Sequence, residues 1–193
     1  MSVKRFTHEK IESLKENEVF VFGSNVQGEH VGGAAFYAAT NFGAKYGLGV
    51  GLQGQSYAIP TCIRLSDKEG KRYTKPFESV EQIKPYIEVF INDAVRCQHL
   101  TFYVTKIGCG IAGFNIREIA ELYRPCLDMD NVILPKEFVE HLLYTEIVYN
   151  LKERGLRGGK DYDDDLAVKF VMERIHAKSL DDILDEFQEM IAL

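Results

Sequence analysis

The sequence predicts an α/β layer fold with a largely parallel or mixed sheet. Short apolar runs rich in β-forming residues alternate with longer stretches whose apolar residues recur at helical spacing. Glycine-rich segments stand at two of the junctions where a strand-like run leads into a helix-like stretch. Strands and helices in alternation are typical of helices packed on a sheet.

Four strands are expected from these apolar runs. Their residues are 18–22 (EVFVF), 56–59 (SYAI), 101–104 (TFYV) and 131–134 (NVIL). Two helices are expected between them, an Ala-rich one over residues 33–46 and a second over 80–97. The second helix follows Ser79 and Gln82 at capping-box spacing, and Pro85 falls in its first turns.

Two further helices are expected in the second half of the chain. Asn115 and Glu118 predict an N-terminal cap for a helix over 116–127. Residues 136–153 continue with apolar side chains at near-helical spacing. We expect a nucleotide-binding domain over residues 1–155.

The last part of the chain, residues 156–193, is predicted to be an acidic helical extension. After a glycine break, residues 161–193 hold ten acidic and three basic residues and two candidate helices. The second begins at the cap pair Ser179 and Asp182, and its apolar residues share one face. Such a face must be buried, either on the body of the protein or, through residues 179–193, on a protein partner or a second copy of the chain.

Composition and charge exclude several classes. The chain has 193 residues, 46% of them hydrophobic, and a formal net charge of -6. The first 160 residues carry 19 acids and 20 bases. Binding of long nucleic acid is disfavoured, because there is no basic stripe and the acidic extension repels phosphate backbones. The sequence shows no apolar run long enough for a membrane span and no signal-peptide core, so we expect no membrane partner.

The cysteines and histidines indicate a cytoplasmic protein without a metal site or cofactor. Cys62, Cys97, Cys109 and Cys126 show no C-x-x-C spacing and no disulfide-scaffold pattern, which fits a reducing compartment. Four histidines are scattered without the spacing of metal ligands: His8, His99, His141 and His176.

One glycine loop is typical of a diphosphate site. Gly108, Gly110 and Gly113 fit G-x-G-x-x-G between a strand and a helix. An NAD-dependent Rossmann enzyme is one alternative, but that fingerprint normally follows the first strand and needs a carboxylate at the end of the next. Here Asp128 and Asp130 precede the strand NVIL instead. The same pattern at residues 49–54 leads into a strand and lacks the helix that would receive phosphate.

The second glycine cluster also joins a strand to a helix. Asn25 closes the strand, and its amide can donate to and accept from a sugar hydroxyl. Gly32 and Gly33 open the helix and present backbone donors. Two such loops at one sheet edge would form a cleft suited to a diphosphate flanked by sugars.

These residues together resemble the macro domain superfamily of ADP-ribose-binding modules. The stretch 107–114 (IGCGIAGF) is similar to the family's I-G-T-G-x-x-G-[YF] loop, with Cys109 in place of Thr. Gly23-Ser24-Asn25 stands where the family has Ala-Ala-Asn, and residues 28–35 stand where it has a glycine run. SYAIP lies between the two motifs in the family's order, and the resemblance covers roughly residues 18–150.

The resemblance implies a three-layer α/β/α fold that binds ADP-ribose or a related nucleotide diphosphate-sugar, or an ADP-ribosylated protein. Asn25 would contact the distal ribose and Phe114 would lie against it. Some members only bind, and others hydrolyse an ADP-ribosyl bond or a distal-ribose substituent. Asn25 and His30 are the candidate catalytic residues, while a nucleophilic Cys109 is disfavoured. The implied ligand-binding residues are Gly23, Ser24, Asn25, Gly32, Gly33, Ala34, Ile107, Gly108, Cys109, Gly110, Ile111, Ala112, Gly113 and Phe114.

The chain departs from the family pattern in two places. The first loop is about three residues shorter than usual, and Glu29 and His30 replace glycines. The Asp-Ile pair that reads adenine in the family is not found near Lys10 and Ile11. The ligand is therefore expected to be ADP-ribose or a variant of it. A non-enzymatic interaction protein that acts through its C-terminal helix stays open as a third function class.

Overall fold

A computed structural model describes residues 6–192 as an α/β protein with one seven-stranded sheet. The strand order is β1-β7-β6-β2-β4-β3, and β5 pairs with β4. The pairs from β1 to β4 along this order are parallel, whereas β3 and β5 run antiparallel to β4. The predicted mixed, largely parallel sheet is confirmed.

The strands are short, apart from the two at the centre of the sheet. Their bounds are β1 Phe6–Thr7, β2 Glu18–Asn25, β3 Gly51–Gln53, β4 Ser56–Ser66, β5 Arg72–Pro76, β6 Thr101–Val104 and β7 Val132–Pro135. The described residues also form six α-helices and two 3-10 turns. These are α1 Gly33–Asn41, η1 Val80–Gln82, α2 Lys84–Arg96, α3 Ile116–Leu122, η2 Arg124–Asp128, α4 Lys136–Glu153, α5 Asp164–Arg174 and α6 Leu180–Ile191.

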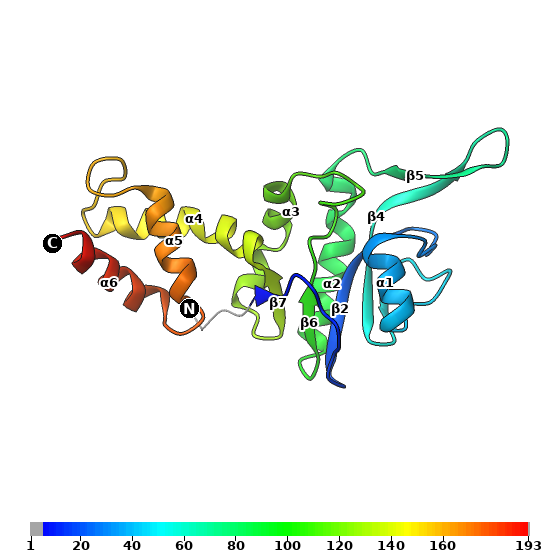
Figure 1. Ribbon diagram of the computed structural model, residues 1–193, viewed down its shortest axis with the longest axis horizontal. Coiled ribbons are helices and arrows are strands. Elements are labelled where there is room, and N and C mark those ends of the chain that lie inside the picture. The colour runs from blue at the N-terminus through cyan, green and yellow to red at the C-terminus, as the bar shows by residue number, and fades with distance from the viewer. Residues whose placement is uncertain (1–5, 193) are drawn as a thin grey trace.

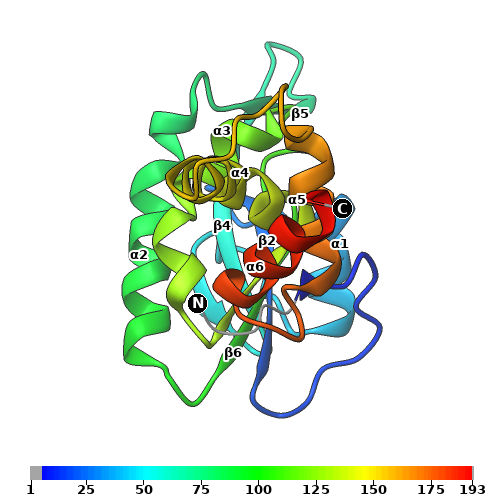
Figure 2. The same cartoon turned by 90° about the vertical axis from the view of Figure 1, so that its left-hand side faces the viewer.

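Alternation along β2 creates the three predicted layers. Val19 and Val21 point into a core shared with α2, α3 and α4. Phe20 and Phe22 point to the opposite face and pack with residues of α1. Successive strand side chains face opposite sides, so one strand serves both cores. Figure 2 shows the sheet between α2 on one side and α1 on the other.

Three expected helices differ in extent from the structure. The helix expected over 33–46 ends at Asn41, and the one expected over 116–127 divides into α3 and η2. The helix expected over 80–97 begins as a separate 3-10 turn, and Pro85 lies in the first turn of α2. Ser79 makes no side-chain cap bond, so the expected capping box is wrong.

The C-terminal extension packs on the second half of α4, as Figure 1 shows at the end of the molecule opposite the β4–β5 hairpin. The apolar face of α6 is buried, with Ile183, Leu184 and Phe187 fully inside. The core that contains these residues is continuous with the core under the sheet. The division into domains 1–155 and 156–193 stays a prediction. Across residues 6–192 no helix has the length and apolar character of a membrane span.

Candidate ligand site

The two predicted glycine loops meet over the carboxyl ends of β2, β4 and β6. Between them lies a cavity of about 230 Å³. Parallel strands bring their carboxyl ends to one edge of a sheet, which is where α/β proteins bind ligands. The cavity wall includes most of the predicted residues: Gly23, Ser24, Asn25, Gly32, Gly33, Ala34, Ile107, Gly108, Gly110, Ile111 and Ala112. Cys109, Gly113, Phe114 and His30 are not part of this wall.

Backbone N–H groups without acceptors border this cavity. Within residues 6–192 the amides of Gly108, Gly110, Ile111 and Ala112 find no hydrogen-bond acceptor. Gly110 itself has open space where a side chain would begin. Unpaired amides in a glycine turn form a concave donor surface for an anion.

The first loop adds the N-terminus of α1. Its N-cap residue is Gly32, which has no side chain to cap the first turn. The first N–H groups of a helix have no partner inside the helix and carry its positive dipole end. Gly32, Gly33 and Ala34 all line the cavity. The two loops therefore offer backbone donors from opposite walls.

Asn25 holds the first loop closed instead of reaching into the cavity freely. Its Nδ2 donates to the carbonyl of Glu29 at 2.8 Å, and its Oδ1 accepts from the Glu29 N–H at 2.9 Å. A register shift between Ser24 and Asn25 pairs Asn25 with Cys62 on β4. Thr61 and Cys62 form the floor of the cavity beside it. The Asn25 amide thus stabilises the first loop and also forms part of the cavity wall.

The first glycine loop also packs against residues 47–49, at the start of the second G-x-G-x-x-G match in the sequence. A Cβ on Gly49 would lie 2.2 Å from the carbonyl oxygen of Asn25, and one on Gly28 would lie 2.3 Å from the Leu48 nitrogen. The Ser24 hydroxyl donates to the Gly49 carbonyl. Only glycine permits this approach of two backbones. The sequence shows no pattern for this contact, because α1 and the turn that follows it separate the two segments along the chain.

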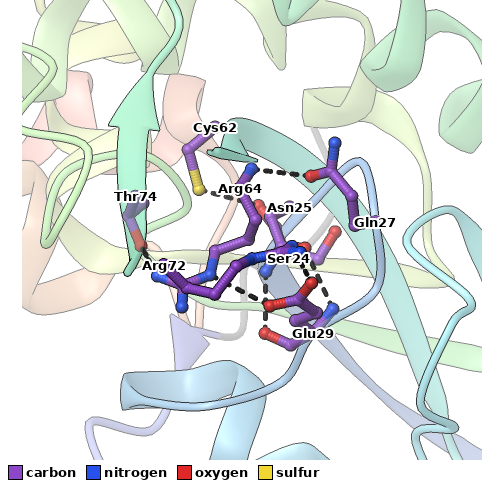
Figure 3. Close-up of polar contacts among 8 residues, drawn as sticks. All are labelled: Ser24, Asn25, Gln27, Glu29, Cys62, Arg64, Arg72 and Thr74. Carbon is purple, nitrogen blue, oxygen red and sulfur yellow. Dashed lines mark hydrogen bonds and ion pairs between the residues drawn. The ribbon is translucent and has the colours of Figure 1, made fainter. Parts of the chain in front are cut away.

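Four polar residues contact one another beside the cavity, as Figure 3 shows. The carboxylate of Glu29 accepts from Arg64 Nε at 3.2 Å and from the guanidinium of Arg72. Arg64 also donates to the Thr74 hydroxyl at 2.8 Å. Glu29 and Thr74 line the cavity, whereas the arginines, which lie on β4 and β5, are not part of its wall. The β4–β5 hairpin was not predicted, so the sequence reasoning missed this group.

His30 lies in the core behind the loop. Its side chain meets the ring of Phe22 edge-on, and its Nε2 donates to the Lys45 carbonyl at 3.1 Å. Burial lowers the pKa of His30, although the carbonyls of Lys45 and Leu48 oppose that shift. The residue is 6% exposed to solvent. These contacts place His30 outside the wall of the smaller cavity.

Cys109 is held as a thiol. Burial raises its pKa to about 11, and the nearby charge of Lys106 only partly opposes this. A thiol with such a pKa is a weak nucleophile at neutral pH. Phe114 and Gly113 shape the same turn, because the Phe114 N–H donates to the Gly108 carbonyl at 2.9 Å.

A second, larger cavity of about 940 Å³ adjoins the first. The two share Gly33, Ala34, Thr105 and Lys106. Aromatic and aliphatic side chains form much of its wall, including Phe6, Ile11, Phe20, Tyr37 and Tyr103. A cavity of this volume can hold a drug-sized molecule.

The wall of the larger cavity comes from distant parts of the chain. Residues 6–11 comprise β1 and the segment that follows it, and Lys136 and Glu137 open α4. His176 comes from the C-terminal extension. At the shared boundary Lys106 is ion-paired with Glu137, which raises the pKa of the lysine. Of the residues in this wall, the sequence analysis predicted Gly33 and Ala34 as ligand-binding residues. It did not predict the part contributed by β1, because a two-residue strand gives no periodic signal.

Comparison with protein-family models, with curated proteins and with solved structures yields no match. Fold and geometry therefore define the class: an α/β protein with a two-part cavity at the carboxyl edge of its sheet. In residues 6–192 no group of three or more histidine, cysteine or acidic side chains is placed to hold a metal ion.

Proposed function

We propose that the protein binds ADP-ribose or a related nucleotide diphosphate-sugar across the two cavities. The observation that carries the proposal is the set of acceptor-free backbone amides on the Gly108–Ala112 turn, opposite the uncapped start of α1. Such donors favour a phosphate group without needing basic side chains.

The order of the cavities along the sheet supports the same ligand. The larger, aromatic cavity lies over β1, β7 and β6 and suits a nucleoside. The shared boundary, with Lys106, suits the diphosphate. The smaller cavity lies over β2 and β4 and suits the second sugar, near Asn25, Thr61 and Cys62. A nucleotide that carries a sugar beyond its diphosphate has this sequence of groups.

Binding is favoured over hydrolysis. Hydrolysis requires an acid or base within hydrogen-bond reach of the reacting bond. The titratable side chains on the smaller cavity are Glu29, Cys62 and Lys106. Glu29 is held by two arginines, and burial raises the pKa of Cys62. A binding module that recognises free ADP-ribose or an ADP-ribosylated protein fits these groups better than a hydrolase.

The sheet gives no support to the NAD-dependent alternative. Rossmann enzymes have the strand order 3-2-1-4-5-6 in an open parallel sheet. Here the order is β1-β7-β6-β2-β4-β3, with antiparallel strands at one side. The turn at Gly108 follows β6, which lies between β7 and β2.

Calorimetric titration with ADP-ribose, and with NAD and AMP as comparison ligands, tests the proposal. Wild type is expected to bind ADP-ribose more tightly than either. Gly110→Ala adds a methyl group where the protein has open space, so its stability should not change. The methyl group would meet the bound phosphates, and affinity should fall by about tenfold or more.

Asn92→Ala on the exposed side of α2 is the control and should bind as wild type does. Unchanged binding by Gly110→Ala would place the ligand elsewhere. Tighter binding of NAD than of ADP-ribose would favour the dehydrogenase class instead.

A further inference from the structure

One edge of the seven-stranded sheet is formed by two strands in series. Strand β3 pairs with residues 56–58 of β4, and β5 pairs with residues 62–66 of the same strand. Because β3 ends the strand order, no strand among residues 6–192 pairs with its other side. The backbone groups of such a free edge can form hydrogen bonds with another chain.

The two halves of this edge differ in the residues that prevent pairing with other chains. Strand β5 contains Arg72, Lys75 and Pro76 within five residues. Charged side chains and proline disfavour the addition of a further strand. Strand β3 has the sequence Gly-Leu-Gln, and residues 46–63 contain no charged side chain. The β3 half of the edge therefore lacks the features that would keep another strand away.

Large apolar side chains are exposed on β3 and in the segment before it. Tyr46, Leu48, Val50 and Leu52 are 77%, 48%, 44% and 49% exposed. Every second residue from 46 to 52 is thus a large apolar one, and the residues between them are glycines. Exposed apolar side chains that occur together, rather than singly, are typical of an interaction surface.

The backbone of Leu52 is directed toward the free side of β3. Strands β3 and β4 are joined by a two-residue turn, in which Gly54 has a φ of 57°. A turn of this length makes Gln53 and Ser56 a hydrogen-bonded pair, and such pairs alternate with non-bonded pairs in antiparallel strands. Leu52 and Tyr57 therefore form a non-bonded pair, so the N–H and the carbonyl of Leu52 point away from β4.

The distribution of charge indicates which partner fits this edge. Residues 161–193 hold ten acidic and three basic residues, and they lie at the end of the molecule away from β4, as Figure 1 shows. A two-fold axis brings an interface beside its own copy, so a surface that pairs with itself must be free of like charges. The β3 edge meets this condition, whereas an acidic or basic partner would find no complementary charge on it.

We propose that a second copy of this chain pairs with the free side of β3, antiparallel and about a two-fold axis, so that one sheet continues through both copies. Leu52, the central residue of β3, then lies opposite Leu52 of the second copy. Because β3 pairs with the first residues of β4 and β5 with its last, the axis directs the two β4–β5 hairpins away from each other. The pairing requires no ligand.

The dimer is expected to be weak, because β3 has only three residues. Interfaces below about 1,200 Å² in total belong to weak complexes. Analytical ultracentrifugation of the full chain between about 5 and 300 µM should show a monomer–dimer equilibrium with a dissociation constant of about 10–100 µM. A monomer at every concentration would overturn the proposal. Association beyond the dimer would also overturn it, because two-fold pairing leaves no β3 edge free.

Leu52→Lys tests the position of the interface. Two lysines directly opposite each other repel, so the dissociation constant of the dimer should rise by about tenfold or more. Leu166→Lys on α5 is the matched control, because Leu166 is 47% exposed and the same substitution changes the net charge equally. Equal weakening in the two variants would overturn pairing through β3.

A mixture of Leu52→Lys and Leu52→Glu tests the two-fold axis. Each variant alone should be monomeric where wild type is dimeric, because like charges lie opposite each other. In an equimolar mixture a lysine lies opposite a glutamate, so dimers should form again with about the wild-type dissociation constant. Failure of the mixture to form dimers would overturn the proposed register.

Amide hydrogen exchange tests the backbone pairing in wild type, without any substitution that could disturb folding. The Leu52 N–H should exchange more slowly at about 300 µM than at about 5 µM, because a hydrogen bond to the second copy protects it in the dimer. Residues 72–76 of β5 are the internal reference and should exchange alike at both concentrations. Equal exchange of Leu52 at the two concentrations would overturn the proposal.

Discussion

Gly49 shows how a single residue outside the ligand loops sets their shape. Its Cα lies so close to the first loop that a Cβ would sit 2.2 Å from the Asn25 oxygen and 2.6 Å from the Val26 oxygen. Both neighbours are backbone atoms, so they cannot turn aside as a flexible side chain can. We expect Gly49→Ala to lower the free energy of unfolding by about 1–3 kcal/mol through overpacking, measured by urea denaturation.

Gly110→Ala, in the second glycine loop, is the control for Gly49→Ala. Nothing lies within 4 Å of the added methyl group there, so its stability should match that of wild type. An equal loss in the two variants would mean that the contact at Gly49 does not restrain the loop. Gly49→Ala should also weaken the proposed binding of ADP-ribose, since the carbonyl that the added methyl group displaces belongs to Asn25.

At the residue scale, local motifs were predictable and contacts across the chain were not. The glycine turn at Gly108 and the position of Asn25 at the end of β2 follow from neighbouring residues. The burial of His30 depends on Phe22 and Lys45, and no sequence spacing reveals it. The same holds for Glu29, whose arginine partners come from a hairpin more than thirty residues later.

At the scale of elements, the short helix α3 fixes the second loop. Asn115 caps it, with Oδ1 accepting from the Arg117 N–H at 2.8 Å. Ile119 of α3 then lies under Gly108, 3.3 Å from where a Cβ would be. We expect Asn115→Ala to lower the free energy of unfolding by about 1 kcal/mol. Asn115→Asp keeps the accepting oxygen and should retain most of the stability, so equal losses in urea denaturation would argue against the cap.

The elements that the sequence predicted are those with a periodic signal of their own. The caps of α3 and α6 are confirmed, because they depend on residues two or three positions apart. Strand β1 has two residues and β3 has three, too few for alternation to be seen. Strand β5 is polar and half-exposed, so it lacks the apolar run that marks the inner strands.

At the scale of the whole molecule, α4 joins the sheet to the extension. Phe138 and Leu142 in its first half and Ile147 and Leu151 in its second half belong to one continuous core. Phe187 of α6 packs at the far end of that core, with its ring 5.3 Å from that of Phe170. The sequence predicted that the apolar face of α6 is buried, but amphipathic spacing alone does not tell which surface covers it.

Phe187→Ala should therefore destabilise the entire chain by about 3–5 kcal/mol. Because the core is continuous, one unfolding transition is expected, with coincident curves from far-UV circular dichroism and tyrosine fluorescence. Exposed Met190→Ala on the same helix is the control and should change stability little. Two separate transitions, with only the first moved by Phe187→Ala, would show that the extension folds as an independent unit.

The larger cavity can form only late in synthesis on the ribosome, because its wall comes from distant parts of the chain. Residues 6–11 are translated before β7, the strand with which β1 pairs and which ends at Pro135, and His176 follows some forty residues later. A nascent chain that stops short of α4 has both glycine loops yet lacks one side of the larger cavity. The proposed capture of a nucleotide thus requires translation to pass residue 176.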